Sequence, residues 1–301
     1  MKSITGLKVG DLSQERQGEI FIFSEALLWS LFPVITVLSL GSFSPVVALG
    51  WSTLFAAVFF GIILAVKKKW KEFKNTSALK DILLATGIIG ILYYLLFFFG
   101  LRSTSAGNAS IIALSEIFFS FLFFNIWRKD YMPTAHIYGA LFMLVGAVIV
   151  LFPNFTAFRS GDMMILLGAA IAPVGNFFQR RARGAVSSET ILFIRSSVGA
   201  PVVFLVAYAL GGSFLAISFN KAFLYLIING LLLLGLSKVF WIEGILRINV
   251  AKAGALSSVG PLFTLLFAWL FLHNAPTIFQ MLSLIPIGAG IILLGSNKKV
   301  W

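Results

Sequence analysis

Long apolar runs divide almost the whole chain, and each run is about as long as a helix that crosses a lipid bilayer. Such a helix needs roughly 20 apolar residues, because the hydrocarbon core is about 30 Å thick. Ten spans are predicted between the polar breaks: 20–38, 45–66, 81–101, 104–126, 134–152, 161–180, 190–210, 221–246, 249–272 and 276–295. Only short loops remain, so the 301 residues leave no room for a soluble domain.

The composition excludes a water-soluble globular protein. Hydrophobic residues make up 59% of the chain and charged residues only 11%, whereas soluble domains carry about 25% charged residues. A chain this apolar cannot cover its surface with polar groups, so the lipid bilayer must surround it. The net charge of +12 does not indicate a nucleic-acid partner, because the positive residues lie in short loops between the apolar runs.

The positions of lysine and arginine predict the orientation. With the N-terminus inside, the inside segments hold 18 of these residues, and the outside segments hold only Arg102, Arg159 and Lys221. Cytoplasmic loops of membrane proteins carry such an excess. We therefore expect a multi-pass protein of the cell (inner) membrane with both termini in the cytoplasm. The remaining two positive residues, Arg195 and Lys238, fall within spans.

The two halves of the chain resemble each other. Residues 101–124 align with residues 246–269 at an offset of 145, and Gly146-Ala147 aligns with Gly288-Ala289 at an offset of 142. Each half contains five spans, and an odd number inverts the second half relative to the first. We predict an all-α membrane protein in which residues 1–152 and 153–301 form two inverted five-helix repeats. Such repeats are typical of secondary transporters with a site near the bilayer midplane.

Two segments carry a resemblance to a known family. Residues 103–109, followed by Ser115-Glu116, and residues 251–270, which contain Gly260-Pro261, resemble helices 4 and 9 of EamA-type members of the drug/metabolite transporter superfamily. The resemblance covers essentially the whole chain. It implies a cavity between the halves, lined mainly by helices 1, 3, 4, 6, 8 and 9, and transport of small organic solutes such as amino acids, often outward. The chain departs from the family where Ile117 follows Glu116, because the family often has proline there.

Three ionisable residues inside the spans are candidates for binding a substrate. A charged side chain at the centre of a membrane helix costs at least about 2.5–3.5 kcal/mol. Glu116 lies at the middle of its span, where it would bind a substrate ammonium or take up a proton; the alternative is a protonated, hydrogen-bonded structural group. Lys238 and Glu25 lie at similar depths toward the cytoplasmic side, so an ion pair or a shared site is expected. Snorkelling of Lys238 to the interface is the alternative.

Uncharged residues complete the predicted site. Pro33 and Pro173 are expected to bend their helices around a cavity. Aromatic side chains would line it, and small or polar residues would add contacts. The predicted substrate-binding residues are Glu116, Lys238, Glu25, Trp29, Tyr94, Ser115, Asn176, Trp241 and Ser258.

Other polar residues are expected to be structural. Arg195 would snorkel or hold the turn between spans 6 and 7. Glu243 and Arg247 are four residues apart in the order that favours a salt bridge along a helix. His136 and His273 lie near span ends, so interfacial positions are expected and no metal site is predicted.

These features together indicate a secondary transporter. The sequence contains no nucleotide-binding loop and no evident nucleophile–base pair, so we expect neither an enzyme nor a cofactor. The expected substrate is a small metabolite such as an amino acid, and export is the expected direction, with its ammonium at Glu116 or Glu25 and its carboxylate at Lys238. The alternatives are a non-transporting membrane scaffold or lipid-binding partner and, within transport, a lipid-linked or nucleotide-sugar carrier.

Overall fold

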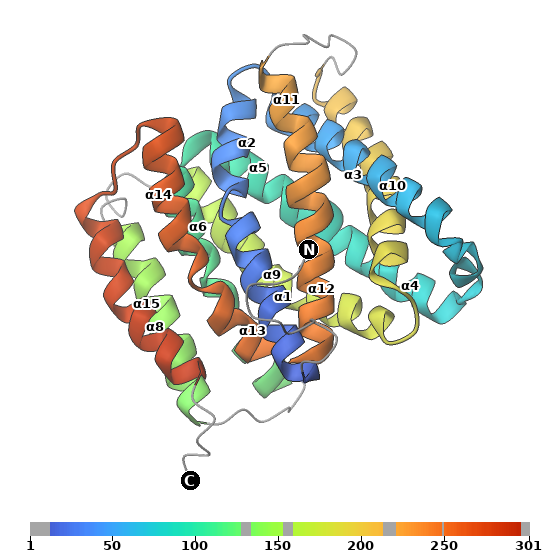
Figure 1. The fold of residues 1–301 in the computed structure, drawn as a ribbon. Helices are drawn as coiled ribbons and strands as arrows, with labels where there is room; N and C mark the ends of the chain where they lie inside the picture. The colour runs from blue at the N-terminus through green and yellow to red at the C-terminus, as the bar shows by residue number, and fades with distance from the viewer. Residues whose placement is uncertain (1–12, 128–133, 153–158, 213–220, 249, 296–301) are drawn as a thin grey trace, which may run out of the picture.

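A computed structural model describes residues 13–127, 134–152, 159–212, 221–248 and 250–295 of the chain. Within these ranges every regular element is a helix (Figure 1). The elements in chain order are α1 (Gln14–Trp29), α2 (Phe32–Leu40), α3 (Pro45–Lys67), η2 (Lys69–Lys74), α4 (Thr76–Ala85), η3 (Thr86–Tyr93), α5 (Tyr94–Ser103), α6 (Ala106–Ala113), α7 (Ser115–Phe121), η4 (Leu122–Trp127), α8 (Thr134–Leu151), α9 (Ser160–Arg183), α10 (Ser188–Ala209), α11 (Lys221–Ile228), η6 (Asn229–Leu236), α12 (Ser237–Arg247), α13 (Val250–Ser257), α14 (Gly260–Leu272) and α15 (Ile278–Gly295). Three of the short elements, η3, η4 and η6, are π-helical.

In the part of the chain that the structure describes, eight helical stretches are long and apolar enough to cross a membrane. They correspond to the first eight expected spans, although several extend a few residues further at each end. The expected ninth and tenth spans correspond to shorter apolar helices, Gly260–Leu272 and Ile278–Leu294. The ninth is interrupted between α13 and α14. The breaks expected after residues 126 and 152 lie mainly outside the described residues.

The outer surface of the helices is apolar. Large hydrophobic side chains point outward along their lengths, and several are more than 60% exposed: Ile62, Val66, Leu205, Leu210, Tyr208, Ile285 and Ile292. A soluble monomer rarely exposes such continuous apolar surface. Lipid chains cover it at no cost, so the surface is that of a multi-pass membrane protein.

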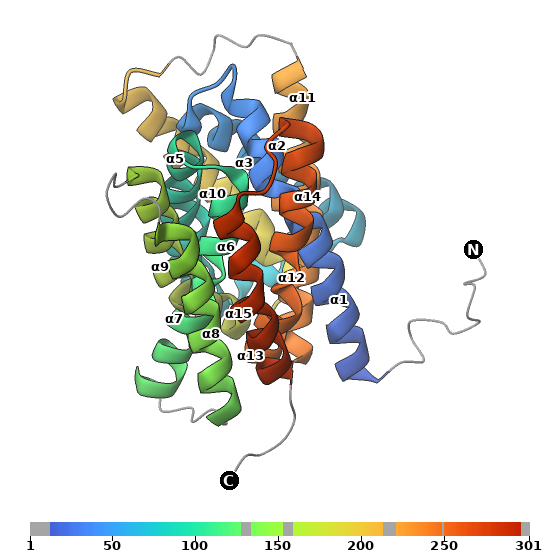
Figure 2. The ribbon, with the colours of Figure 1, turned by 90° about the vertical axis from the view of Figure 1, so that its left-hand side faces the viewer.

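The main helix pairings join the two halves of the sequence. α3 packs along α10, α8 along α15, α1 along α12, and α5 along α9. Figures 1 and 2 show α8 and α15 side by side in both views. Glycine allows close approaches here, because a Cβ added to Gly161 of α9 would lie 2.6 Å from the carbonyl oxygen of Gly100 in α5, and one added to Gly290 of α15 would lie 2.9 Å from that of Gly139 in α8. The interior of the bundle therefore lies between residues of both halves.

Helix irregularities recur at a nearly constant offset along the sequence. The π-helical η3 begins at Thr86 and η6 begins at Asn229, 143 residues later. The break between α6 and α7 falls at Leu114, and the break between α13 and α14 falls at Ser258 and Val259, 144 and 145 residues later. π-Helical turns inside membrane helices are often found at functional sites.

The first span is broken in its middle. α1 ends at Trp29, and α2 begins at Phe32 with Pro33 in its first turn, where proline needs no N–H partner. The carbonyl of Ser30 at the break accepts a 2.9 Å hydrogen bond from the Thr264 hydroxyl of α14. Pro173, in contrast, lies inside the continuous helix α9. Proline therefore accompanies a full helix break in the first span, whereas α9 continues through Pro173.

Ion pairs gather at the end of the bundle where α1 begins, which is the lower end in Figures 1 and 2. Glu243 near the end of α12 binds Arg247, Arg183 at the end of α9, and the Ser188 hydroxyl at the start of α10. We call these four residues the Glu243 cluster. Its Glu243–Arg247 bond, at 2.5 Å, confirms the predicted local salt bridge.

Candidate functional site

A cavity of about 140 Å³ lies inside the helix bundle. A water molecule needs only about 10–15 Å³ of such space, so the cavity has room for several waters or a small solute. Its walls come from α1, η3, α5, α6, α7, α9, α12, α13 and α14, with additional residues of α2, α8, α10 and α15. The helices implied by the family resemblance all contribute, and both halves of the sequence supply lining residues.

Seven of the nine predicted site residues line this cavity: Glu25, Trp29, Tyr94, Glu116, Asn176, Lys238 and Trp241. Ser115 and Ser258 do not. Their hydroxyls donate 2.7 Å hydrogen bonds to the backbone carbonyls of Ile112 and Gly254 in their own helices. A serine that bonds its own helix backbone in this way turns its hydroxyl away from other partners. Ser110, Ser120 and Ser257 line the cavity instead, although the Ser110 hydroxyl also donates a 2.8 Å hydrogen bond to the backbone carbonyl of Gly107.

Lys238 and Glu25 form an ion pair at one side of the cavity. The Lys238 Nζ atom lies 2.8 Å from Glu25 Oε1 and 3.2 Å from the ring centre of Trp29. Only 8% of Lys238 and 2% of Glu25 are exposed. The expected ion pair is therefore confirmed, and Lys238 does not snorkel to the interface. Because each charge is neutralised by the other, the pair presents little net charge to the cavity.

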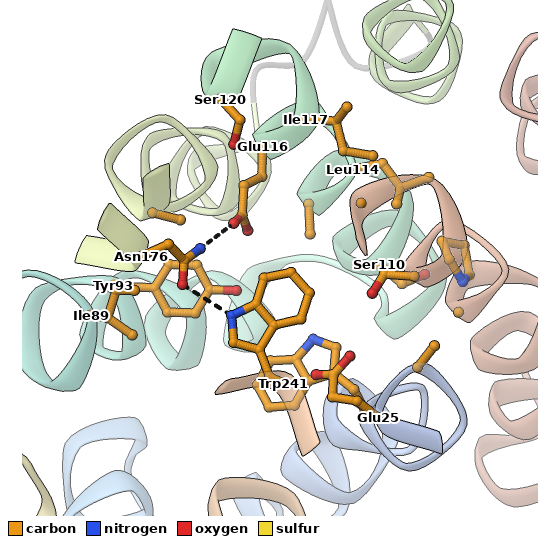
Figure 3. Close-up of a pocket in the computed structure, with 18 of the residues that line it drawn as sticks. Glu25, Ile89, Tyr93, Ser110, Leu114, Glu116, Ile117, Ser120, Asn176 and Trp241 are labelled. Carbon is orange, nitrogen blue, oxygen red and sulfur yellow. Dashed lines mark hydrogen bonds between the residues drawn. The ribbon is translucent and has the colours of Figure 1, made fainter. Parts of the chain in front are cut away.

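Glu116 occupies another side of the cavity. Its Oε1 atom accepts a 2.7 Å hydrogen bond from Asn176 Nδ2, and Asn176 Oδ1 accepts a 3.1 Å bond from Trp241 Nε1 (Figure 3). Asn176 thus lies between a carboxylate on α7 and an indole on α12. No ion pair of Glu116 occurs within the described residues, and its side chain is only partly buried.

Arg195 on α10 is buried beside the same cavity. Only 4% of this residue is exposed, and its Nη1 atom donates a 2.7 Å hydrogen bond to Gln179 Oε1 on α9. Its guanidinium lies 5.9 Å from the ring centre of Tyr94, within range of a cation–π interaction. The expectation that Arg195 snorkels is wrong, because its hydrogen bond and ring contact both hold the side chain in the interior.

The rest of the lining is mostly apolar and aromatic. Ile89, Phe97, Leu114 and Ile117 contribute aliphatic and ring surface, and Tyr93 lies opposite Glu116 across Asn176 in Figure 3. The Ser257 hydroxyl is buried and has no hydrogen-bond partner. A buried unpaired hydroxyl is costly, so Ser257 offers a polar contact that a water or solute would satisfy.

The two histidines lie in different environments. His136 on α8 is buried and lines the cavity, contrary to the expected interfacial position, because α8 packs along α15 with this face inward. His273 is exposed at the end of α14, where it adopts a left-handed backbone conformation with φ of 56°. Its position is the interfacial one that was expected.

Sequence reasoning missed Gln179 and undervalued Arg195. Gln179 stands three residues after Asn176, so both share one face of α9. A glutamine at this spacing within a predicted span was a usable signal. Arg195 stood out as a charge inside a span, but depth along a helix does not reveal which face points inward, so its interior position could not be predicted.

Taken together, the cavity presents a carboxylate, a guanidinium, amide groups and a neutralised ion pair, set among aromatic and aliphatic surface. Such groups bind and orient a small solute that has both charged and apolar parts.

Comparisons with known proteins agree with this architecture. The profile of the EamA-like transporter family matches residues 16–152 and again residues 159–296. An uncharacterized transporter of Methanothermobacter thermautotrophicus is 24% identical over 94% of this chain and 87% of its own length. The uncharacterized transporter YoaV of Bacillus subtilis is 22% identical over 90% of this chain and 94% of its own length.

A solved crystal structure has the same fold. It superposes with a TM-score of 0.74 at 19% sequence identity, and the match covers 93% of this chain and 96% of that one. Both the family profile and the two relatives extend over nearly the whole sequence, so the assignment does not depend on one motif. The chain belongs to the EamA-like transporter family, within the drug/metabolite transporter superfamily.

Proposed function

We propose that this transporter exports a small zwitterionic metabolite, such as an amino acid, across the cell (inner) membrane. The observation that carries the proposal is the position of Glu116. Its carboxylate borders a cavity in the interior of an apolar bundle and has no ion-pair partner within the described residues. A carboxylate is expensive at this depth, and a cationic group of a solute would compensate it.

Alternating access would follow from the relation between residues 1–152 and 153–301. The main helix pairings join these two parts, and helix irregularities recur at offsets of 143 to 145 residues. Both observations support two related five-helix repeats around the cavity, in an inverted arrangement with ten spans. Rocking one repeat against the other would expose the cavity to each side in turn.

The excess of positive residues in one set of loops supports cytoplasmic termini. The described ends of the chain agree with this orientation, because α1 begins and α15 ends at the same end of the bundle (Figure 2). The Glu243 cluster lies at that end as well. In this orientation the ion pairs close the cytoplasmic side, and uptake of a proton by Glu116 would provide a driving force for export.

A membrane scaffold is the alternative outside transport. It predicts that the charges inside the membrane pair with one another and that no cavity exists. Lys238 and Glu25 meet the first condition, whereas Glu116 and Arg195 do not within the described residues. The second condition is not met either, because a cavity is present. Nothing in this lining favours a nucleotide-sugar carrier either, because the charges in the cavity are balanced in sign.

Flux through the purified protein tests the proposal. Proteoliposomes loaded with unlabelled L-leucine should accumulate external labelled L-leucine faster than protein-free liposomes loaded in the same way. The Glu116→Gln variant should reduce the initial rate by about 10- to 100-fold, because it removes a charged hydrogen-bond acceptor. Arg102→Gln, at an exposed position, should retain the wild-type rate. A wild-type rate in Glu116→Gln would remove Glu116 from the mechanism.

A further inference from the structure

Two opposite charges in the cavity lack an ion-pair partner within the described residues. They are Arg195 on α10 and Glu116 on α7. We propose that Arg195, and not Lys238, binds the carboxylate of the transported solute, with Glu116 binding its ammonium. This assignment rests on the proposed function and names the class of solute more closely.

Lys238 is poorly placed for the carboxylate. Its Nζ atom already contacts Glu25 Oε1 at 2.8 Å and the ring of Trp29 at 3.2 Å from the ring centre. A solute carboxylate would have to displace Glu25, which would leave that carboxylate buried and unpaired. Breaking a buried ion pair in this way is strongly unfavourable.

Arg195 has a charge and hydrogen-bond donors available for a solute carboxylate, whereas the charge of Lys238 is already neutralised by Glu25. A guanidinium carries five N–H donors. Gln179 Oε1 and the Tyr94 hydroxyl are its hydrogen-bond partners among the described residues, so donors remain for a carboxylate. Both partner groups are neutral, so they do not cancel the positive charge. The planar guanidinium also matches a carboxylate in a two-bond geometry. A buried cation of this kind beside a cavity is a binding site for a compact anionic group.

A one-way chain of hydrogen bonds links the two charges. Arg195 donates to Gln179 Oε1 at 2.7 Å, Gln179 Nε2 donates to Asn176 Oδ1 at 3.1 Å, and Asn176 Nδ2 donates to Glu116 Oε1 at 2.7 Å. The direction is fixed because arginine only donates and a carboxylate only accepts. Each amide is therefore held in one orientation, and the cation and the anion are held as opposite ends of one arrangement.

The space beside this chain indicates the remainder of the solute. Ile89, Phe97, Leu114 and Ile117 line the same cavity. A cation and an anion flanked by aliphatic and aromatic side chains suit an α-amino acid with an apolar side chain. A solute that has an ammonium but no carboxylate would leave the Arg195 charge uncompensated.

Binding selectivity tests the assignment. The probes are L-leucine and L-leucinamide, which differ in the carboxylate, titrated into the purified full-length protein while tryptophan fluorescence is recorded. The wild type should bind L-leucine at least about tenfold more tightly than L-leucinamide. Arg195→Gln should abolish this preference by weakening L-leucine binding alone. Arg102→Gln is the matched control and should keep the preference.

A second variant keeps the test decisive if Arg195→Gln does not fold. Gln179→Glu has nearly the same size and places a carboxylate against the guanidinium, so it should also abolish the preference. An undiminished preference in the folded variants would overturn the assignment to Arg195 and leave the proposed transport function standing. A wild type that binds no amino acid would overturn the amino-acid substrate, and with it this assignment.

Discussion

The amino group of Lys238 lies 2.8 Å from Oε1 of Glu25, which joins α12 to α1 across the interior of the bundle. The two residues are 213 positions apart in the sequence. Both side chains are almost fully buried, so each charge depends on the other for compensation. The pair therefore holds the first helix against the second half of the chain at the side of the cavity.

Removing one member of this pair should cost more stability than removing both. Lys238→Met or Glu25→Gln alone leaves a group without its partner, and such losses are about 3–5 kcal/mol. The double variant should recover much of this loss, because no uncompensated charge remains. Thermal unfolding of the detergent-purified protein, followed as a complete double-mutant cycle, measures the coupling. Strictly additive effects would show that the two charges do not stabilise each other.

The Glu243 cluster should control opening at the end where α1 begins. Glu243 accepts hydrogen bonds from Arg183 at 2.9 Å and Arg247 at 2.5 Å, and it also binds Ser188. Glu243→Gln removes the charge that joins α9, α10 and α12, so the cavity should open more often at this end. A cysteine introduced at Ser257 should then react severalfold faster with a membrane-impermeant thiol reagent added from this side.

The chain suits this labelling because it contains no native cysteine. Glu15→Gln is the control, since Glu15 lies at the same end but is 61% exposed in its ion pair with Lys252. Exposed pairs contribute little to stability, so labelling should not change. Equal rates in Glu243→Gln and the wild type would indicate that the Glu243 cluster does not close this end.

Glu72 should make stability depend on pH. It lies in η2 between two membrane-spanning helices and accepts hydrogen bonds from Ser187 N at 2.8 Å, Ser187 Oγ at 2.7 Å and Thr190 Oγ1 at 2.6 Å. Partial burial alone would raise the pKa of Glu72, but the bonds from Thr190 and Ser187 outweigh burial and hold this pKa below its ordinary value.

A lowered pKa in the folded state means that Glu72 stabilises the fold above the ordinary glutamate pKa of about 4.3. This contribution is lost as the pH falls through the lowered pKa. The melting temperature of Glu72→Gln should therefore lie below that of the wild type near pH 7, and the difference should shrink as the pH falls below about 4. A difference that stays constant over this range would contradict the role of the ionised carboxylate.

Much of the fold was predictable because the bilayer constrains it so strongly. Apolar runs of the necessary length can only be helices in lipid, so the positions of eight spans followed from the sequence. The breaks within the membrane-spanning helices were harder to predict. The break at Ser258 and Val259 is followed at once by Gly260-Pro261, a signal for a new helix start, whereas the matching break at Leu114 has neither glycine nor proline beside it.

The candidate site was predicted in part for a related reason. Rare polar residues in apolar spans stand out, which identified Glu116, Lys238, Glu25 and Asn176 as inward-facing groups. The pair of Lys238 and Glu25 was expected from their similar depth. The hydrogen bonds of Glu116 to Asn176 and of Arg195 to Gln179 could not be deduced, because depth along a helix gives no information about rotation around it.

Transport by this chain requires that the cavity be a solute site that opens to both sides of the membrane. The most direct test is labelling of Ser257→Cys, whose native hydroxyl borders the cavity without a partner. Lys71→Cys and Arg102→Cys, at exposed positions near opposite ends, report the reagent on each side. We predict that an impermeant thiol reagent modifies Ser257→Cys from either side in oriented vesicles, and that L-leucine slows both reactions. Modification from neither side, while the two control cysteines react normally, would show that the cavity is closed to solutes.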